Sequence, residues 1–210
     1  ERDRVKQQAS ELIRRVENEL QKNRHKLKKQ EKELLATDNA EEFRQKGELL
    51  TTFLHQVPND QDQVTLDNYY TNQPITIALD KALTPSQNAQ RYFKRYQKLK
   101  EAVKYLTELI EETKATILYL ESVETVLSQA GLEEIAEIRE ELIQTGFIRR
   151  RQREKIQKRK KPEQYLASDG KTIIYVGRNN LQNEELTFKM ARKEELWFHA
   201  KDIPGSHVVI

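Results

Sequence analysis

The 210-residue chain is highly charged: 34% of its residues are Asp, Glu, Lys or Arg, and 36% are hydrophobic. This balance favours long amphipathic helices over a thick globular core. The absence of Cys excludes a disulfide framework and thiolate chemistry. No apolar run reaches the length of about 18 residues that a membrane-spanning helix needs. The chain opens on the mid-helix pattern ERDRVKQQ and closes inside the apolar run HVVI, so we expect a fragment of a longer protein.

The charge is unevenly distributed along the chain. The total is only +3, but residues 147–161 (FIRRRQREKIQKRKK) hold nine Lys or Arg and one Glu, a net charge of +8. The remaining residues therefore carry −5. Such a concentration of positive charge favours a polyanionic partner more than the near-neutral total does.

Two long segments have the periodicity of paired helices. In residues 1–35 the apolar positions recur every seven residues, and residues 85–129 keep an alternating three–four spacing over about 68 Å of helix. We therefore predict a mainly α fold built on a long antiparallel coiled coil, with these two helices paired within one chain. Pairing between two chains is the alternative. The repeating positions of the first helix include Ile13, Leu20, Leu27 and Leu34.

Residues 38–83 are predicted to form a small α+β tip module between the two long helices. Asp38 followed by Glu41 is a capping-box pattern at the start of a short helix. The β-rich runs VTLDNYY and PITIALD then predict a β-hairpin at 64–79. Thr84 is the expected N-cap of the second long helix, with Pro85 at its first position and Gln87 at its third.

The chain after the coiled coil is predicted to contain a short helix at 132–145, with Gly131 ending the long helix before it and Gly146 ending the short one. The basic segment 147–161 is expected to be helical and to complete a middle domain spanning 1–161. Residues 162–210 are predicted to form an incomplete α+β C-terminal domain.

Within this last domain, TIIYVG and HVVI are predicted strands, and NEELTFKMA is a predicted helix capped by Asn183. The stretch ELWFHAK alternates in polarity. This pattern predicts a strand that buries Leu196, Phe198 and Ala200 and presents Trp197, His199 and Lys201 on its other face.

The sequence lacks the motifs of an enzyme. It has no phosphate-binding glycine loop and no nucleophile in an elbow motif. His199 and His207 flank a turn, but only a carboxylate such as Asp202 is available to complete a metal site, and no activated nucleophile accompanies them as general bases. We therefore predict no catalytic residues, no metal and no cofactor.

Basic and aromatic side chains indicate RNA binding instead, because cations follow phosphates and rings stack on unpaired bases. The alternatives are that Trp197 packs against neighbouring structure, that Asn179 and Asn180 are turn residues, and that 149–161 is a solvated surface or linker. The candidate RNA-binding residues are Arg149, Arg150, Arg151, Arg153, Lys158, Arg159, Lys160, Arg178, Asn179, Asn180, Lys189, Trp197, His199, Lys201 and His207.

The final 42 residues carry a recognisable motif order: DG, VGRNN, N, LT, K, A, W, H, K and PGSH, within DGKTIIYVGRNNLQNEELTFKMARKEELWFHAKDIPGSHVVI. This segment resembles the start of the RNA-binding domain of the NFACT family, and the preceding residues resemble that family's coiled-coil middle domain. Glu184 and Glu195 stand where typical members have Asp.

The resemblance implies a non-enzymatic factor of ribosome-associated quality control. Such a factor binds the large ribosomal subunit (rRNA) that still holds peptidyl-tRNA, recruits tRNA, and promotes C-terminal alanine tailing of the stalled chain. Its expected location is cytoplasmic and ribosome-associated. Some family members are named fibronectin-binding proteins, so a surface adhesin is one alternative. A coiled-coil scaffold for protein partners is another.

Overall fold

A computed structural model of the chain describes residues 2–152, 156, 158–201 and 205–210. It divides into two compact units, one made of residues 1–25 and 113–210 and the other of residues 26–112. Each unit is considered by itself. Among the described residues, no helix is both long enough and apolar enough to cross a membrane.

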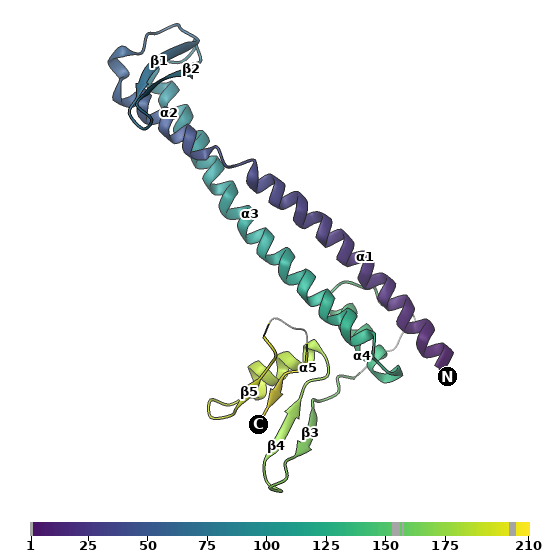
Figure 1. The fold of residues 1–210 in the computed structure, drawn as a ribbon. Helices are drawn as coiled ribbons and strands as arrows, with labels where there is room; N and C mark the ends of the chain where they lie inside the picture. The colour runs from purple at the N-terminus through teal and green to yellow at the C-terminus, as the bar shows by residue number, and fades with distance from the viewer. Residues whose placement is uncertain (1, 153–155, 157, 202–204) are drawn as a thin grey trace. The chain divides into compact units, whose positions relative to one another are not determined.

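Two long helices form the antiparallel pair predicted from the heptads: α1 (Arg2–Leu35) and α3 (Pro85–Leu127) (Figure 1). In the unit of 1–25 and 113–210, their buried seam is part of one apolar cluster with residues of α4 (Leu132–Gln144). Leu12 is buried although the heptad pattern omits it, since a three-helix cluster buries a wider face than a two-helix seam does. The seam consists of Leu12, Val16, Leu20, Leu120, Val123 and Leu127.

The unit of 26–112 contains the predicted tip module. Helix α2 (Ala40–Thr52) and the 3₁₀ turn η1 (Leu54–Gln56) lead into the antiparallel strands β1 (Gln63–Asn68) and β2 (Gln73–Ala78). Gly47 lies against the Phe93 ring, which would be 3.0 Å from a Cβ at this position. The two elements can approach this closely only because residue 47 has no side chain. The buried core of this module is Leu49, Leu50, Val57, Val64, Leu66, Ile77 and Ala89.

The capping predictions at the tip had different outcomes. Thr84 and Gln87 form the predicted reciprocal capping box, with the Gln87 amide donating to Thr84 Oγ1 at 3.2 Å and the Thr84 amide donating to Gln87 Oε1 at 2.9 Å. The Asp38 capping box is wrong: the N-cap of α2 is Asn39, which makes no side-chain cap bond. Glu41 is instead paired with Arg44, one helical turn along.

Helix α4 begins at a residue that was predicted to end the preceding helix. Gly131 has φ −82° and is the N-cap of α4, its amide donating to Glu134, whereas α3 ends earlier at Leu127. The prediction of Gly131 as a C-cap glycine is therefore wrong, since that role needs a positive φ. Gly146, with φ +85°, does end α4 as predicted.

The described part of the basic segment is not helical, contrary to prediction. Residues 147–152, 156 and 158–161 contain no helix or strand. A helix would stack like charges three and four residues apart, which is unfavourable. In the observed conformation, several of these cations instead reach carboxylates of α4.

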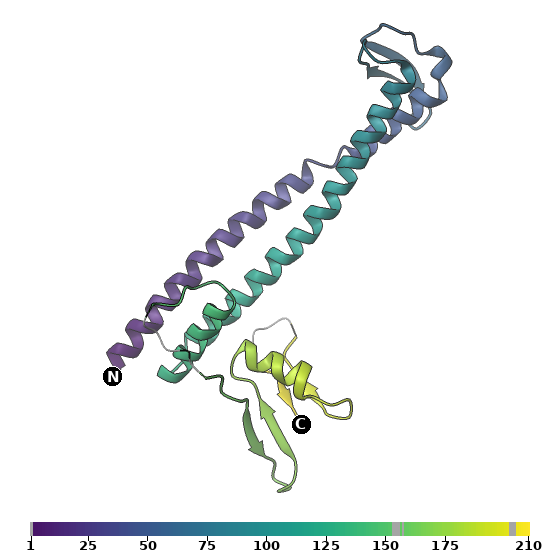
Figure 2. The ribbon, with the colours of Figure 1, turned by 180° about the vertical axis from the view of Figure 1, so that it is seen from behind.

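The terminal residues form a four-stranded antiparallel sheet in the order β3-β4-β6-β5, and Figure 2 shows α5 beside it. The predicted N-cap Asn183 is wrong, because the cap of α5 is Asn179. Asn183 is buried and binds the other end of the module instead, accepting the His207 amide at 2.9 Å and donating to the Gly205 carbonyl at 3.1 Å. The elements are β3 (Glu163–Leu166), β4 (Ile173–Val176), α5 (Asn180–Glu185), the π-helical turn η2 (Leu186–Met190), β5 (Trp197–Phe198) and β6 (Val208–Val209).

The predicted buried face of ELWFHAK is exposed. Leu196 and Phe198 are 62% and 50% exposed, and Ala200 is exposed as well. Strand β5 is only two residues long and lies at the sheet edge. None of the described elements covers this face, so the alternation predicted the strand but not which side is buried.

Candidate nucleic-acid interface

The basic segment lies against α4, five of whose thirteen residues are Glu. Arg150 donates to both carboxylate oxygens of Glu140, Nη1 to Oε2 at 2.9 Å and Nη2 to Oε1. Lys160 Nζ lies 2.7 Å from Glu133 and 3.6 Å from Glu137. Several predicted phosphate-binding cations are therefore already paired within the chain.

Two further predicted residues of the segment are engaged outside these pairs. Arg159 donates to Gln144 Oε1 at 2.7 Å, and Arg151 lies 3.0 Å from Glu11 of α1. Arg153 lies outside the described residues. The segment is thus held at several points along α4 and α1 rather than standing free as a solvated linker.

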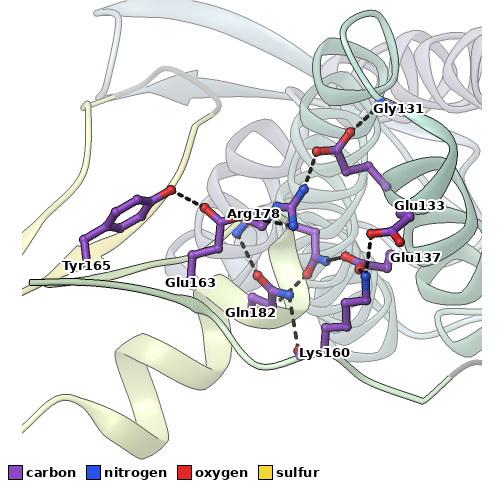
Figure 3. A network of polar contacts seen from close by, with 10 residues as sticks. Gly131, Glu133, Glu137, Lys160, Glu163, Tyr165, Arg178 and Gln182 are labelled. Atoms are coloured by element: carbon purple, nitrogen blue, oxygen red, sulfur yellow. Dashed lines mark hydrogen bonds and ion pairs between the residues drawn. The ribbon is translucent and has the colours of Figure 1, made fainter. Parts of the chain in front are cut away.

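Arg178 is the centre of the polar network in Figure 3. Its guanidinium binds Glu134 and lies 3.1 Å from Glu163, while its amide donates to Gln182 at 2.9 Å. Hydrogen bonding from the Gly131 amide, and then from Arg178, lowers the pKa of Glu134 below its ordinary value. The arrangement joins α4 to strand β3 and to the loop between β4 and α5.

Asn179 and Asn180 have local structural contacts. Asn179 Oδ1 accepts the Gln182 amide at 2.9 Å and so caps α5. The side-chain amide of Asn180 donates through Nδ2 to the Ser122 hydroxyl of α3 at 3.0 Å. Both residues are partly buried. These contacts agree with the turn-residue interpretation weighed for them; the RNA-binding role stays a prediction.

Four predicted cations are different from the paired ones: Arg149, Lys158, Lys189 and Lys201 are exposed. In the part of the chain that the structure describes, none of the four side chains has a hydrogen-bond or ion-pair partner. Their charge is not offset by a carboxylate at contact distance. They therefore need no rearrangement before contacting a phosphate group.

One groove brings together basic residues that are distant in sequence. Residues 159–161 of the basic segment form one side, and α5 with η2 forms the other, enclosing about 500 Å³. Phe188, 82% exposed, lies in this groove beside Lys189. Sequence reasoning missed Phe188 because it assigned this residue to an ordinary helix. The groove is lined by Arg159, Lys160, Lys161, Leu181, Glu184, Glu185, Phe188 and Lys189.

A second cluster contains Trp197, His199, His207 and Thr187. The Trp197 indole donates to the Thr187 hydroxyl at 3.1 Å, and that hydroxyl lies 2.7 Å from His207 Nδ1. The His199 and His207 rings are 4.4 Å apart between centroids. Burial, and then the neighbouring His199, lower the pKa of His207. The sequence placed Trp197 and His199 together correctly, and the structure adds His207, whereas Lys201 has no contact in this cluster.

Metal chemistry has no support in the described part of the chain. No group of three or more His, Cys, Asp or Glu side chains there could hold an ion. Asp202, the carboxylate weighed as a third ligand, lies outside the described residues.

Comparison with known proteins connects these features to a family. The family described as NFACT N-terminal and middle domains matches residues 1–161. The chain is 97% identical over 210 residues to the Rqc2 homolog RqcH of Streptococcus pneumoniae serotype 2, and 46% identical over 217 residues to the protein of the same name from Bacillus subtilis. In both comparisons all of this chain is matched, and it spans 38% of the relative's length.

A solved structure shows the same fold. The C-terminal part of the fibronectin/fibrinogen-binding protein from Streptococcus suis is 64% identical, with a TM-score of 0.75. The match covers 98% of this chain and 70% of that one. With the family match over residues 1–161, the long antiparallel helix pair and the full-length similarity to RqcH proteins, this chain belongs to the NFACT family.

Proposed function

We propose that this chain is the RNA-holding part of a ribosome-associated quality-control factor. In this proposal the complete protein binds the large ribosomal subunit with its peptidyl-tRNA, recruits tRNA and promotes alanine tailing of the stalled chain in the cytoplasm. Family membership and the similarity to proteins named Rqc2 homolog RqcH support this role. Peptide-bond formation stays with the ribosome, so the factor acts by binding and not as an enzyme.

The groove between the basic segment and η2 is the observation that carries the RNA-binding proposal. This groove is lined by Lys161, Lys189 and the exposed Phe188, together with Arg159, Lys160, Leu181, Glu184 and Glu185. Lysines bind phosphate groups as point charges, and an exposed aromatic ring offers a platform for an unstacked base. In the proposal, Lys158, Arg149 and Lys201 extend the same positive surface.

The paired cations have a different role in this proposal. Arg150 and Arg178 are only about a quarter exposed, and each is matched by one or more carboxylates. Such groups cost more to remove from their partners than exposed ones do. We assign them to holding the basic segment and the loop between β4 and α5 in place, and we assign the first phosphate contacts to the exposed lysines.

The decisive experiment measures binding of the 210-residue chain to tRNA and to purified large ribosomal subunits over a series of salt concentrations. The triple variant Lys158→Glu, Lys161→Glu, Lys189→Glu should lose most of the affinity for both. The salt dependence of the residual binding should also become shallower, because each lost phosphate contact reduces the log–log slope by about 0.7 to 0.9.

A matched control changes the same charge elsewhere: Lys6→Glu, Lys26→Glu, Lys28→Glu on exposed positions of α1. For tRNA, the control should lose far less affinity than the groove variant. Equal losses in the two triple variants would mean that tRNA responds to net charge alone, and the groove assignment would then be wrong.

Fibronectin binding is a second candidate function. It is favoured by one observation, the 64% identity to the Streptococcus suis protein described as fibronectin/fibrinogen-binding. A specific protein interface should survive physiological salt and should be insensitive to the groove variant. Surface plasmon resonance with immobilised fibronectin would decide this, because binding that disappears with salt and with the lysines indicates nonspecific charge attraction.

A further inference from the structure

We infer that carboxylates of α4 compete with RNA for Lys160 of the basic segment and for Arg178, so that α4 is an intramolecular acidic mask. This inference rests on the proposed RNA-binding function and concerns its regulation. The acidic mask consists of Glu133, Glu134 and Glu137 on α4, which form ion pairs with Lys160 and Arg178. Figure 3 shows Glu133 and Glu137 both directed at Lys160.

Lys160 carries the argument because it belongs to two sites at once. It is an ion-pair partner of Glu133 and Glu137, and it also lines the groove with Lys161, Lys189 and Phe188. An ammonium group bound to two carboxylates offers less attraction to an incoming phosphate. Lys160 therefore contributes fully to the groove only after it leaves α4.

The Lys160–Glu133 contact has the properties of an exchangeable pair. Their side chains are 50% and 77% exposed, so water and salt screen the attraction between them. A phosphate group replaces a carboxylate with similar hydrogen-bonding geometry and at least equal charge. When an RNA phosphate replaces Glu133 as the partner of Lys160, little attraction to Glu133 is lost. Lys160 gains a contact of comparable strength with the phosphate.

Arg178 gives the mask a more firmly held part. Its guanidinium is 28% exposed and contacts Glu134 and Glu163 from two different elements. Glu134 is also bound by the Gly131 amide at the start of α4. Release of Arg178 would loosen a helix cap as well as an ion pair. RNA phosphates are therefore expected to displace the carboxylates from Lys160 more easily than from Arg178.

The mask has a plain consequence for selectivity. With Lys160 and Arg178 neutralised, short or weakly charged RNA meets only the exposed lysines of the groove. A longer or correctly shaped RNA supplies enough phosphates to displace the carboxylates. The acidic helix thus lowers nonspecific affinity, which is set mainly by the number of cations that reach phosphates.

The test removes the carboxylate charge while keeping side-chain shape. Glu133→Gln, Glu134→Gln, Glu137→Gln in the 210-residue chain should bind tRNA severalfold more tightly at low salt. Its log–log salt slope should be steeper by about 0.7 to 0.9, as expected for the one additional phosphate contact that Lys160 supplies while Arg178 still contacts Glu163. A matched control, Glu17→Gln, Glu31→Gln, Glu194→Gln, makes the same change in net charge at exposed positions.

Adding Lys160→Met to the triple variant should abolish most of the gain in affinity. Glu133→Gln alone, at an exposed carboxylate, should show a smaller gain and serves as the test if the triple variant fails to fold by circular dichroism. An equal gain in the control variant, or a gain that persists without Lys160, would overturn the mask.

The outcomes separate the two proposals. If the wild-type chain binds tRNA through the groove lysines and the Gln variants bind with unchanged affinity and slope, only the mask is wrong. If neither the wild-type chain nor the Gln variants bind tRNA more tightly than the groove variant does, the proposed RNA-binding function fails and the mask fails with it.

Discussion

The tip module and the terminal sheet are both small β structures with a helix, but they bury their apolar residues to different extents. In the tip module Leu49, Leu50 and Ile77 have no exposed surface. In the terminal sheet Leu186 and Val209 are buried, whereas Phe188, Leu196, Trp197 and Phe198 are each between 46% and 82% exposed. The tip buries a core of its own although Leu54, Tyr69 and Tyr70 are 40% to 47% exposed, whereas the exposed apolar and aromatic side chains of the terminal residues reach 82%.

This difference is informative about function. A large, contiguous exposed apolar surface next to charged residues is typical of a binding site. A closed core such as that of the tip contributes stability and rigidity. This comparison supports the proposal that recognition lies on the terminal module and on the basic segment, whose residues share the groove at Phe188.

The strongest test of the comparison is truncation of equivalent leucines. Leu50→Ala should reduce the free energy of unfolding by about 2 to 5 kcal/mol, because it leaves a cavity in a fully buried core. Leu196→Ala, at a position 62% exposed, should change it by less than about 0.5 kcal/mol. Urea unfolding followed by circular dichroism measures both. Similar losses at the two sites would show that the terminal face is covered in solution.

A second prediction concerns the attachment of the basic segment to α4. Arg150 and Glu140 form a bidentate pair with side chains 27% and 9% exposed. Arg150→Ala should cost about 3 kcal/mol, since it leaves a carboxylate buried without this partner. Lys160→Ala removes a solvent-exposed contact with Glu133 and only a longer contact, 3.6 Å, with the 9% exposed Glu137, so it should lower the unfolding midpoint less than Arg150→Ala does. Thermal unfolding of the two variants distinguishes a structural anchor from an exchangeable contact.

A third prediction compares the helix caps of the two modules. Asn179→Ala should reduce the stability of the terminal module by about 1 kcal/mol, because it removes the side-chain cap of α5. Asn39→Ala at the start of α2 removes no such bond and should have a smaller effect. The single Trp, residue 197, reports unfolding of the terminal module by fluorescence, and circular dichroism reports the helices. Equal losses of stability at the two caps would contradict the role of the Asn179 side chain as the cap of α5.

The smallest expected effect is the pH dependence of the terminal module. The pKa of His207 is lowered from its ordinary value near 6.5, so the folded state favours the neutral ring. As the pH falls below about 6.5, the unfolded chain takes up the proton first, and the stability of this module declines until the folded pKa is passed. Titration of the imidazole signals by NMR checks this. A His207 pKa at or above 6.5 would show that the cluster does not disfavour the charged form.

Local patterns in the sequence were sufficient for much of the fold. The heptad spacing predicted both long helices, the β-rich runs predicted the hairpin, and Thr84 with Gln87 predicted a cap that forms as expected. These features depend on residues within about one or two helical turns of each other, so the periodicity of the chain contains the required information. The boundary between domains at 161 and 162 and the RNA-binding roles stay predictions.

The sequence by itself therefore determined the two long helices, the hairpin at the tip and where positive charge accumulates. Only the tertiary structure decided which cations are paired, because Arg150 and Lys160 meet α4 carboxylates 10 and 27 residues away in the chain. The same holds for Asn183, which binds Gly205 and His207 instead of capping a helix, and for the groove that unites 159–161 with Phe188 and Lys189. Such contacts depend on how separate elements pack, which the period of a single segment does not specify.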